Sequence, residues 1–99
     1  MPDEIVSYVA MLEPGERSGY VVSFPDLDGC LADGETVREA TLMAQDAMTV
    51  YLSALKQLRE PFPPPAFNPR GVLDPNTYVG ITIKITIKRS DLTDLVQEQ

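Results

Sequence analysis

Four segments of the chain carry the short apolar runs or the alternating apolar and polar residues that predict β-strands. Residues 4–12 are apolar on both faces, which is typical of a strand at the centre of a sheet. Residues 20–24 and 30–32 are shorter runs bounded by Gly, Pro and Asp, so we expect the first three strands to form a meander. Residues 78–88 alternate most regularly. Isoleucine takes one face and lysine or threonine the other: Ile81, Ile83, Ile85, Ile87 against Thr82, Lys84, Thr86, Lys88.

Residues 37–58 follow the 3.6-residue period of an amphipathic helix. Thr36 and Glu39 fit a capping box at its start, and Glu60-Pro61 ends it because the residue before proline avoids the helical region. The predicted buried stripe is Val37, Ala40, Ala44, Ala47, Met48, Tyr51, Leu55 and Leu58. Polar residues, Ser53 among them, take the opposite side.

A proline-rich connection follows the helix. Six prolines lie between Pro61 and Asn76, which predicts a stiff, extended segment, and Phe62 and Phe67 are expected to hold it against the domain. A polyproline docking ligand is the alternative. After the last strand, Ser90 could cap a short helix.

These elements predict an α+β fold: one small β-β-β-α-β domain with a long helix on a sheet. Its expected parts are a core at 4–60, a connection at 61–76, a last strand at 78–88 and a C-terminal tail at 89–99.

Composition narrows the function. The net charge of −7 disfavours nucleic-acid binding and favours a basic protein partner, although solubility alone also explains it. The chain has no histidine and a single cysteine, Cys30, which excludes Ser-His-Asp and Cys-His catalysis and the usual zinc sites. No apolar run is long enough to span a bilayer and the N-terminus has no basic leader, so we expect a cytoplasmic protein.

Asp26, Asp28, Asp33 and Glu35 crowd one short segment and could hold a cation. An EF-hand loop fails because Leu31 takes the position of its obligatory glycine. Turn and cap geometry explains the acids without a metal, so we expect no cofactor and no catalytic site. Cys30 lies next to no basic residue and is expected to be an inert, buried thiol.

The last twenty residues also match the opening of a ribbon-helix-helix DNA-binding module. That module needs two complete helices in each subunit, and only residues 90–99 follow Arg89. A last sheet strand with a short tail is the alternative, and DNA binding by this chain is therefore not expected.

The central motifs, in order, resemble the HicB family of antitoxins. They are the string GYVVSFPDLDGC (residues 19–30), then ADGET (residues 32–36), then Glu39-Ala40 and a long alanine-rich helix. The resemblance covers about residues 4–65. It implies a partial RNase H-like fold with a mixed sheet, in which the last strand lies parallel to the first after a right-handed crossover.

The resemblance also implies a function: binding and blocking a small HicA-type toxin, an mRNA-cleaving ribonuclease. Many family members carry a further C-terminal DNA-binding domain, of which this chain has at most the start. We therefore expect a non-enzymatic antitoxin. A stand-alone oligomeric interaction module of the same fold is the alternative, and a residual metal-dependent nuclease is a third hypothesis.

Two surfaces are candidates for partners. The turn after the second strand is expected to present Leu27 as an apolar anchor between acids, giving a toxin-binding site of Phe24, Pro25, Asp26, Leu27 and Asp28. A homodimer or tetramer is expected through the last strand and the apolar residues off the helical stripe. These are Leu42, Met43, Val50, Ile81, Ile83 and Lys84.

Overall fold

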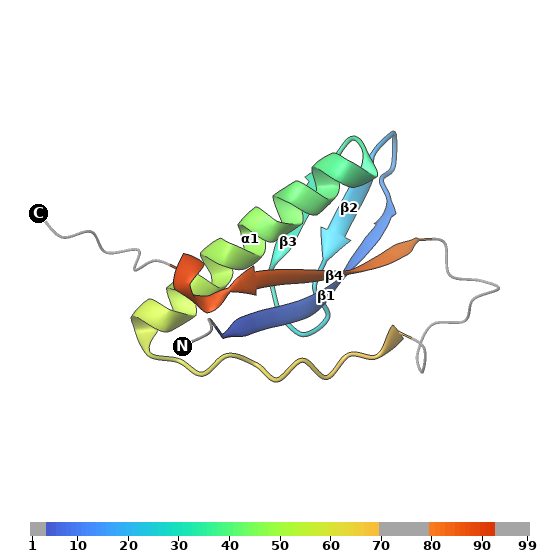
Figure 1. Cartoon of the computed structure of the whole chain (residues 1–99). Helices are drawn as coiled ribbons and strands as arrows, with labels where there is room; N and C mark the ends of the chain where they lie inside the picture. The colour runs from blue at the N-terminus through green and yellow to red at the C-terminus, as the bar shows by residue number, and fades with distance from the viewer. Residues whose placement is uncertain (1–3, 70–79, 93–99) are drawn as a thin grey trace, which may run out of the picture.

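The computed structural model describes residues 4–69 and 80–92. The secondary-structure elements, in chain order, are β1 (Ile5–Pro14), β2 (Tyr20–Ser23), β3 (Leu31–Gly34), α1 (Val37–Leu58), β4 (Ile81–Lys88) and a 3₁₀ turn, η1 (Arg89–Asp91). Figure 1 shows α1 lying across one face of the sheet. The predicted α+β fold with one long helix is confirmed.

The four strands form one sheet in the order β3-β2-β1-β4. β1 is central, as its two apolar faces predicted: residues 11–14 pair with β2 and residues 5–12 pair with β4. β2 pairs in turn with β3, so the predicted three-stranded meander is also confirmed.

The expectation that β4 runs parallel to β1 is wrong. β4 is antiparallel, with Ile5 opposite Lys88 and Leu12 opposite Ile81, so the sheet is antiparallel throughout rather than mixed. A parallel strand would have to enter the sheet directly from the end of α1. Instead, residues 60–69 run back along the length of the sheet as an extended segment (Figure 1), so β4 starts at the other end.

Both ends of α1 are fixed by local chemistry. At the start, the Thr36 hydroxyl accepts a hydrogen bond from the Glu39 N–H (3.0 Å), and the Glu39 carboxylate accepts one from the Glu35 N–H (2.6 Å). The predicted cap is confirmed, with the glutamate satisfying the donor one residue before Thr36. At the other end, Arg59 adopts a left-handed conformation with φ 59° and stops the helix.

The core lies between α1 and the sheet. Its members are Tyr8, Ala10, Leu12, Val22, Phe24, Leu27, Cys30, Ala40, Ala44, Met48, Leu52, Ile85, Ile87 and Leu92. Gly34 allows α1 to approach β3, because a Cβ there would lie 2.4 Å from the Ala40 nitrogen.

The predicted buried stripe of α1 is correct in its first half and wrong near its end. Leu52 and Ser53 are buried, whereas Leu58 is 67% exposed. α1 leans toward the end of β4 as it proceeds: Gln45 Nε2 lies 3.5 Å from the Thr86 carbonyl and Lys56 Nζ 3.5 Å from the Leu92 carbonyl. The buried side of the helix therefore turns toward Leu52.

The C-terminal expectations need two corrections. β4 begins at Ile81, and Gly80 precedes it as a bend; the earlier part of the predicted strand, residues 78–79, lies outside the described residues. Ser90 does not cap a helix, because it lies inside η1 and Leu92 is already extended. The rest of the predicted short helix lies outside the described residues.

Candidate protein-binding surface

The turn from Phe24 to Cys30 was expected to present Leu27 to a partner, and that geometry is wrong. Phe24 is 3% exposed and Leu27 is 1% exposed. Two successive turns fold Leu27 inward: its N–H donates to the Phe24 carbonyl, and the Cys30 N–H donates to the Leu27 carbonyl, each at 3.0 Å. Burial of apolar area decides the direction of Leu27, and only Pro25 and Asp28 of the predicted site are exposed.

Asp26 holds the proline-rich segment. Its Oδ2 accepts hydrogen bonds from the backbone N–H groups of Ala66 (3.0 Å) and Phe67 (2.9 Å), forty residues further along the chain. The carboxylate therefore joins the turn after β2 to the segment that returns the chain to β4. This role is structural.

Two further contacts fix the same segment, and the second agrees with the prediction that Phe62 holds it against the domain. The Tyr8 hydroxyl donates to the Pro63 carbonyl at 2.6 Å. The Arg89 guanidinium lies 4.4 Å from the centre of the Phe62 ring, close enough for a cation–π interaction. Burial, followed by the charge of Asp26, raises the pKa of Tyr8, so its hydroxyl stays protonated as a donor.

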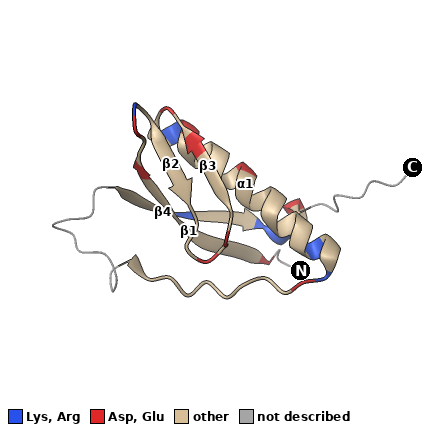
Figure 2. Ribbon diagram, turned by 180° about the vertical axis from the view of Figure 1, so that it is seen from behind, with Lys and Arg blue, Asp and Glu red and all other residues tan. Residues whose placement is uncertain are grey.

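Charge is unevenly distributed along the molecule (Figure 2). Acids gather where the β1–β2 loop, the end of β3 and the first turn of α1 meet, whereas bases and acids are mixed near the ends of α1 and β4. The first group is Glu13, Glu16, Asp33, Glu35 and Glu39, with Arg17 and Arg38 nearby; the second is Lys56, Arg59, Lys88 and Arg89, with Glu4, Glu60 and Asp91 nearby. The helix dipole contributes to this arrangement, because it favours acids at the start of α1 and bases at its end.

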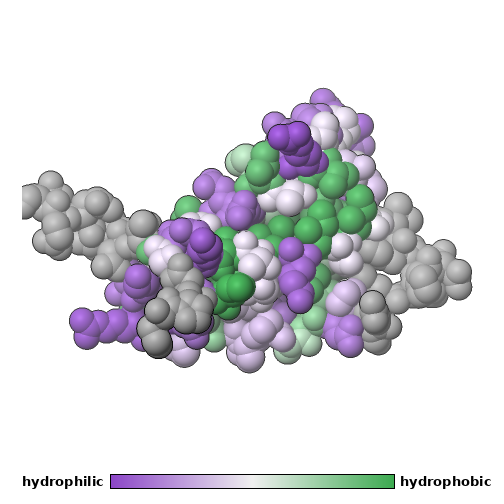
Figure 3. Space-filling model, in the orientation of Figure 1, coloured by the Kyte–Doolittle hydropathy of each residue, from purple (hydrophilic) through white to green (hydrophobic). Residues whose placement is uncertain are grey.

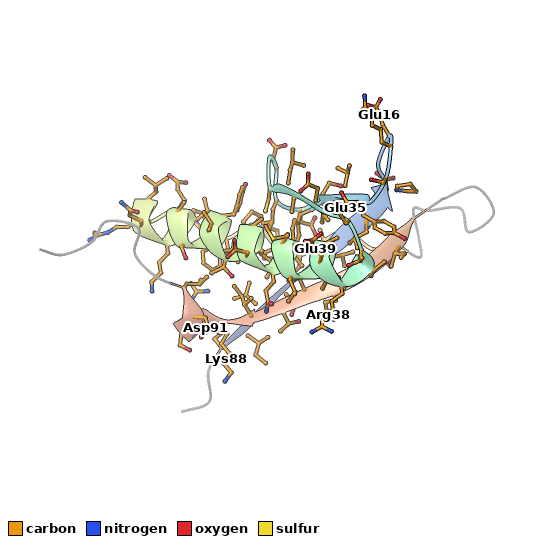
Figure 4. All side chains as sticks on the ribbon, turned by 90° about the horizontal axis from the view of Figure 1, so that it is seen from above. Glu16, Glu35, Arg38, Glu39, Lys88 and Asp91 are labelled. Carbon is orange, nitrogen blue, oxygen red and sulfur yellow. The ribbon has the colours of Figure 1, made fainter. Side chains whose placement is uncertain are left out.

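The acidic end is hollowed. An open hollow of about 360 Å³ is lined by residues of the β1–β2 loop, β2, β3 and α1, among them Glu16, Asp33, Glu35, Glu39 and Met43. Figure 4 shows Glu35 and Glu39 on one side of α1 and Arg38 on the other. The hollow thus combines negative charge with an apolar side chain, Met43, which is 45% exposed.

Exposed apolar side chains occupy two other surfaces. On the sheet face turned away from α1, here called the open face, Val21 is 50% and Leu31 65% exposed. On α1, Leu42 is 56% and Val50 53% exposed, which agrees with their prediction as surface residues off the stripe.

Three of the predicted oligomer residues belong to β4, and their environments differ. Ile81 is 37% exposed, Lys84 is exposed, and Ile83 is partly buried against the core. Figure 3 shows apolar surface where the first turns of α1 pass beside β4. Because Ile83 packs against the core, it contributes more to the fold than to an outer surface.

The part of the chain that the structure describes offers few side chains arranged for catalysis. Within residues 4–69 and 80–92, no three His, Cys, Asp or Glu side chains converge to hold a metal ion. Burial raises the pKa of Cys30 to about 11, in agreement with the prediction of an inert thiol. No helix in these residues is long and apolar enough to cross a membrane.

Two features were not predicted from the sequence: the acidic hollow, and the two hydrogen bonds that Asp26 accepts from the proline-rich segment. Asp33, Glu35 and Glu39 were assigned to turn and cap chemistry, and no periodicity relates them to Glu16 in the β1–β2 loop. One signal was available: Asp33 alternates with Ala32 and Gly34, which places Asp33 on the side of β3 away from the core.

Sequence comparison finds antitoxins. A family model described as the HicB-like antitoxin of bacterial toxin–antitoxin systems matches residues 8–98. Antitoxin HicB 1 of Photorhabdus laumondii subsp. laumondii is 36% identical over 81 residues, which make up 82% of this chain and 48% of that protein. The chain therefore spans about half the length of this relative.

Structural comparison agrees. The Burkholderia pseudomallei antitoxin HicB superposes with a TM-score of 0.74 at 19% identity, covering 95% of this chain and 72% of the other, which shows a shared fold. A chain of the HicA3–HicB3 toxin–antitoxin complex superposes with a TM-score of 0.63 at 25% identity. That match covers 81% of this chain and 95% of the other.

Proposed function

The chain belongs to the HicB-like antitoxin family of bacterial toxin–antitoxin systems, and from this premise we propose that it binds and masks a small, basic HicA-type ribonuclease toxin. The observation that carries the proposal is the match to a chain of a toxin–antitoxin complex over 81% of the present chain. The family match over residues 8–98 supports it, because it includes the whole sheet from Tyr8 onward and all of α1.

Electrostatics supports the same partner. The chain carries a net charge of −7, and its acids gather at the hollowed end of the sheet. A ribonuclease that binds RNA needs basic side chains for the phosphates, so complementary potentials would bring the two proteins together and cover the toxin's RNA-binding surface. Masking of this kind requires no catalysis by the antitoxin, and we propose a non-enzymatic function in the cytoplasm.

The test is co-expression of the chain with the small basic protein encoded beside its gene. We expect that protein to arrest growth when expressed alone, and the two proteins together to restore growth and to purify as one complex. Leu12→Asp, which places a charge at a core position that is 0% exposed, is the matched loss-of-fold control and should restore nothing. Persistent arrest in the presence of folded wild-type chain would contradict the proposal.

Self-association is a second proposal, supported by specific exposed residues. Leu42 and Val50 on α1 and Ile81 at the start of β4 remain exposed. We propose that these residues contribute to contacts between copies of the chain. Sedimentation of the wild type against Leu42→Lys tests this, since a wild type that stays monomeric at micromolar concentration removes the interface.

DNA binding is outside the proposed function. Non-specific affinity for DNA depends on neutralising phosphates, which a chain of net charge −7 does poorly.

A further inference from the structure

The sheet has two edges, and they differ in charge. Within residues 4–69 and 80–92, neither β3 nor β4 pairs with another strand on its outer side. Such an edge presents unpaired backbone N–H and C=O groups, so it can accept an extended segment from a partner. Which edge accepts a given partner then depends on the side chains beside it.

The β4 edge is protected. Lys84 and Lys88 are both exposed on β4, and lysine on an edge strand opposes the addition of another strand. Gln45 of α1 reaches over this edge, with its Nε2 3.5 Å from the Thr86 carbonyl oxygen. A basic segment would meet the positive charge of these lysines, and the Thr86 carbonyl at this edge already accepts a hydrogen bond from Gln45.

The β3 edge has the opposite character. β3 contains no Lys or Arg, and Asp33 is exposed on it. Glu35 follows the strand and Glu39 lies across the same hollow, so the end of the edge is acidic. In Figure 4 these two glutamates lie on the side of α1 away from Arg38.

Apolar side chains flank the β3 edge on both faces of the sheet. Leu31 is on the open face, where the β2–β3 register sets it opposite Ser23 and sets Val21 opposite Asp33. On the α1 side, Met43 lines the same hollow as Asp33 and Gly34. Alternate side chains of an added strand would meet Leu31 on one face and Met43 on the other.

From these features we propose that the toxin docks by adding an extended, basic segment to the β3 edge, with backbone hydrogen bonds to residues 31–34 and basic side chains toward Asp33, Glu35 and Glu39. The inference rests on the proposed function, because it takes the basic toxin as the occupant. Charge complementarity favours this occupant over a second copy of the chain, since β3 is acidic itself and two β3 edges would repel.

The test compares two charge reversals in the full chain. Asp33→Lys lies on the β3 edge, and Glu60→Lys, which makes the same charge change at an exposed site just after α1, is the matched control. Binding to the small basic protein encoded beside the gene is measured by titration calorimetry, after circular dichroism has shown that both variants fold. Asp33→Lys should weaken binding by about tenfold or more, and Glu60→Lys should leave it within about twofold.

Amide hydrogen exchange then distinguishes strand addition from side-chain docking. Binding should slow exchange at the alternate amides within residues 31–34 that point away from β2, and it should leave residues 81–88 unchanged. If wild-type chain does not bind, the proposed function and this inference both fall. If it binds and Asp33→Lys binds equally well, or if β3 amides gain no protection, only the inference falls. Protection of β3 in the free chain that grows with concentration would mean that a second copy occupies the edge, which also overturns it.

Discussion

Replacing Asp26 by alanine should loosen the proline-rich segment while leaving the turn itself in place. Asp26 accepts two backbone hydrogen bonds through one carboxylate oxygen, from Ala66 at 3.0 Å and Phe67 at 2.9 Å. Hydrogen bonds to a charged group contribute about 1.5–3 kcal/mol each when buried. Asp26 and Phe67 are only partly buried and Ala66 is exposed, so the sum falls to about 1.5–2 kcal/mol.

Such a loss should lower the melting temperature by roughly 6–16 °C for a domain of this size. Asp28→Ala is the matched control, because Asp28 is exposed in the same turn and no hydrogen bond or ion pair of its side chain is found among the described residues. Asp26→Asn should fall between the two, since its amide oxygen still accepts. Thermal melts give the stability, and amide exchange at Ala66 and Phe67 reports the segment directly. Equal melts for Asp26→Ala and Asp28→Ala, with unchanged exchange at both amides, would refute the reasoning.

Three more predictions concern the core and its chemistry. Leu27→Ala should lower the free energy of unfolding, measured in urea, by about 3 kcal/mol, because it opens a cavity at a side chain that is 1% exposed. Leu31→Ala, at a side chain that is 65% exposed, should lower it by less than about 0.5 kcal/mol. Equal losses would contradict the inward direction of Leu27. Gly34→Ala should lower stability by about 3 kcal/mol, since its Cβ would lie 2.4 Å from the Ala40 nitrogen and α1 would have to move; a melt identical to wild type would show that the helix is not so closely placed. Folding raises the pKa of Cys30 from 9.0 to about 11, so the folded state binds the proton more tightly than the unfolded state. The stability that this contributes should be complete below pH 9 and lost as pH rises through 11. At pH 8 the thiol should react with a disulfide reagent only after denaturation.

The sequence by itself determined the kind and order of the elements and the start of α1, because those signals are local. The alternation along β4, the 3.6-residue period of α1 and the cap formed by Thr36 and Glu39 all act within a few residues, and each is present in the structure. The string from Gly19 to Cys30 carried the family resemblance, which the family match over residues 8–98 confirms.

Tertiary structure decided what depends on contacts between distant segments. β4 is antiparallel because residues 60–69 return the chain along the sheet, and they are held there by Asp26, forty residues away in sequence. Leu27 turns inward because a core formed by other elements receives it, which no pattern within the turn specifies. The acidic hollow joins four elements, and its acids come from the β1–β2 loop, the end of β3 and α1, which no sequence pattern relates, so only folding brings them together. Local periodicity sets which face of an element is apolar; the direction of a strand and the composition of a surface follow from how the elements pack.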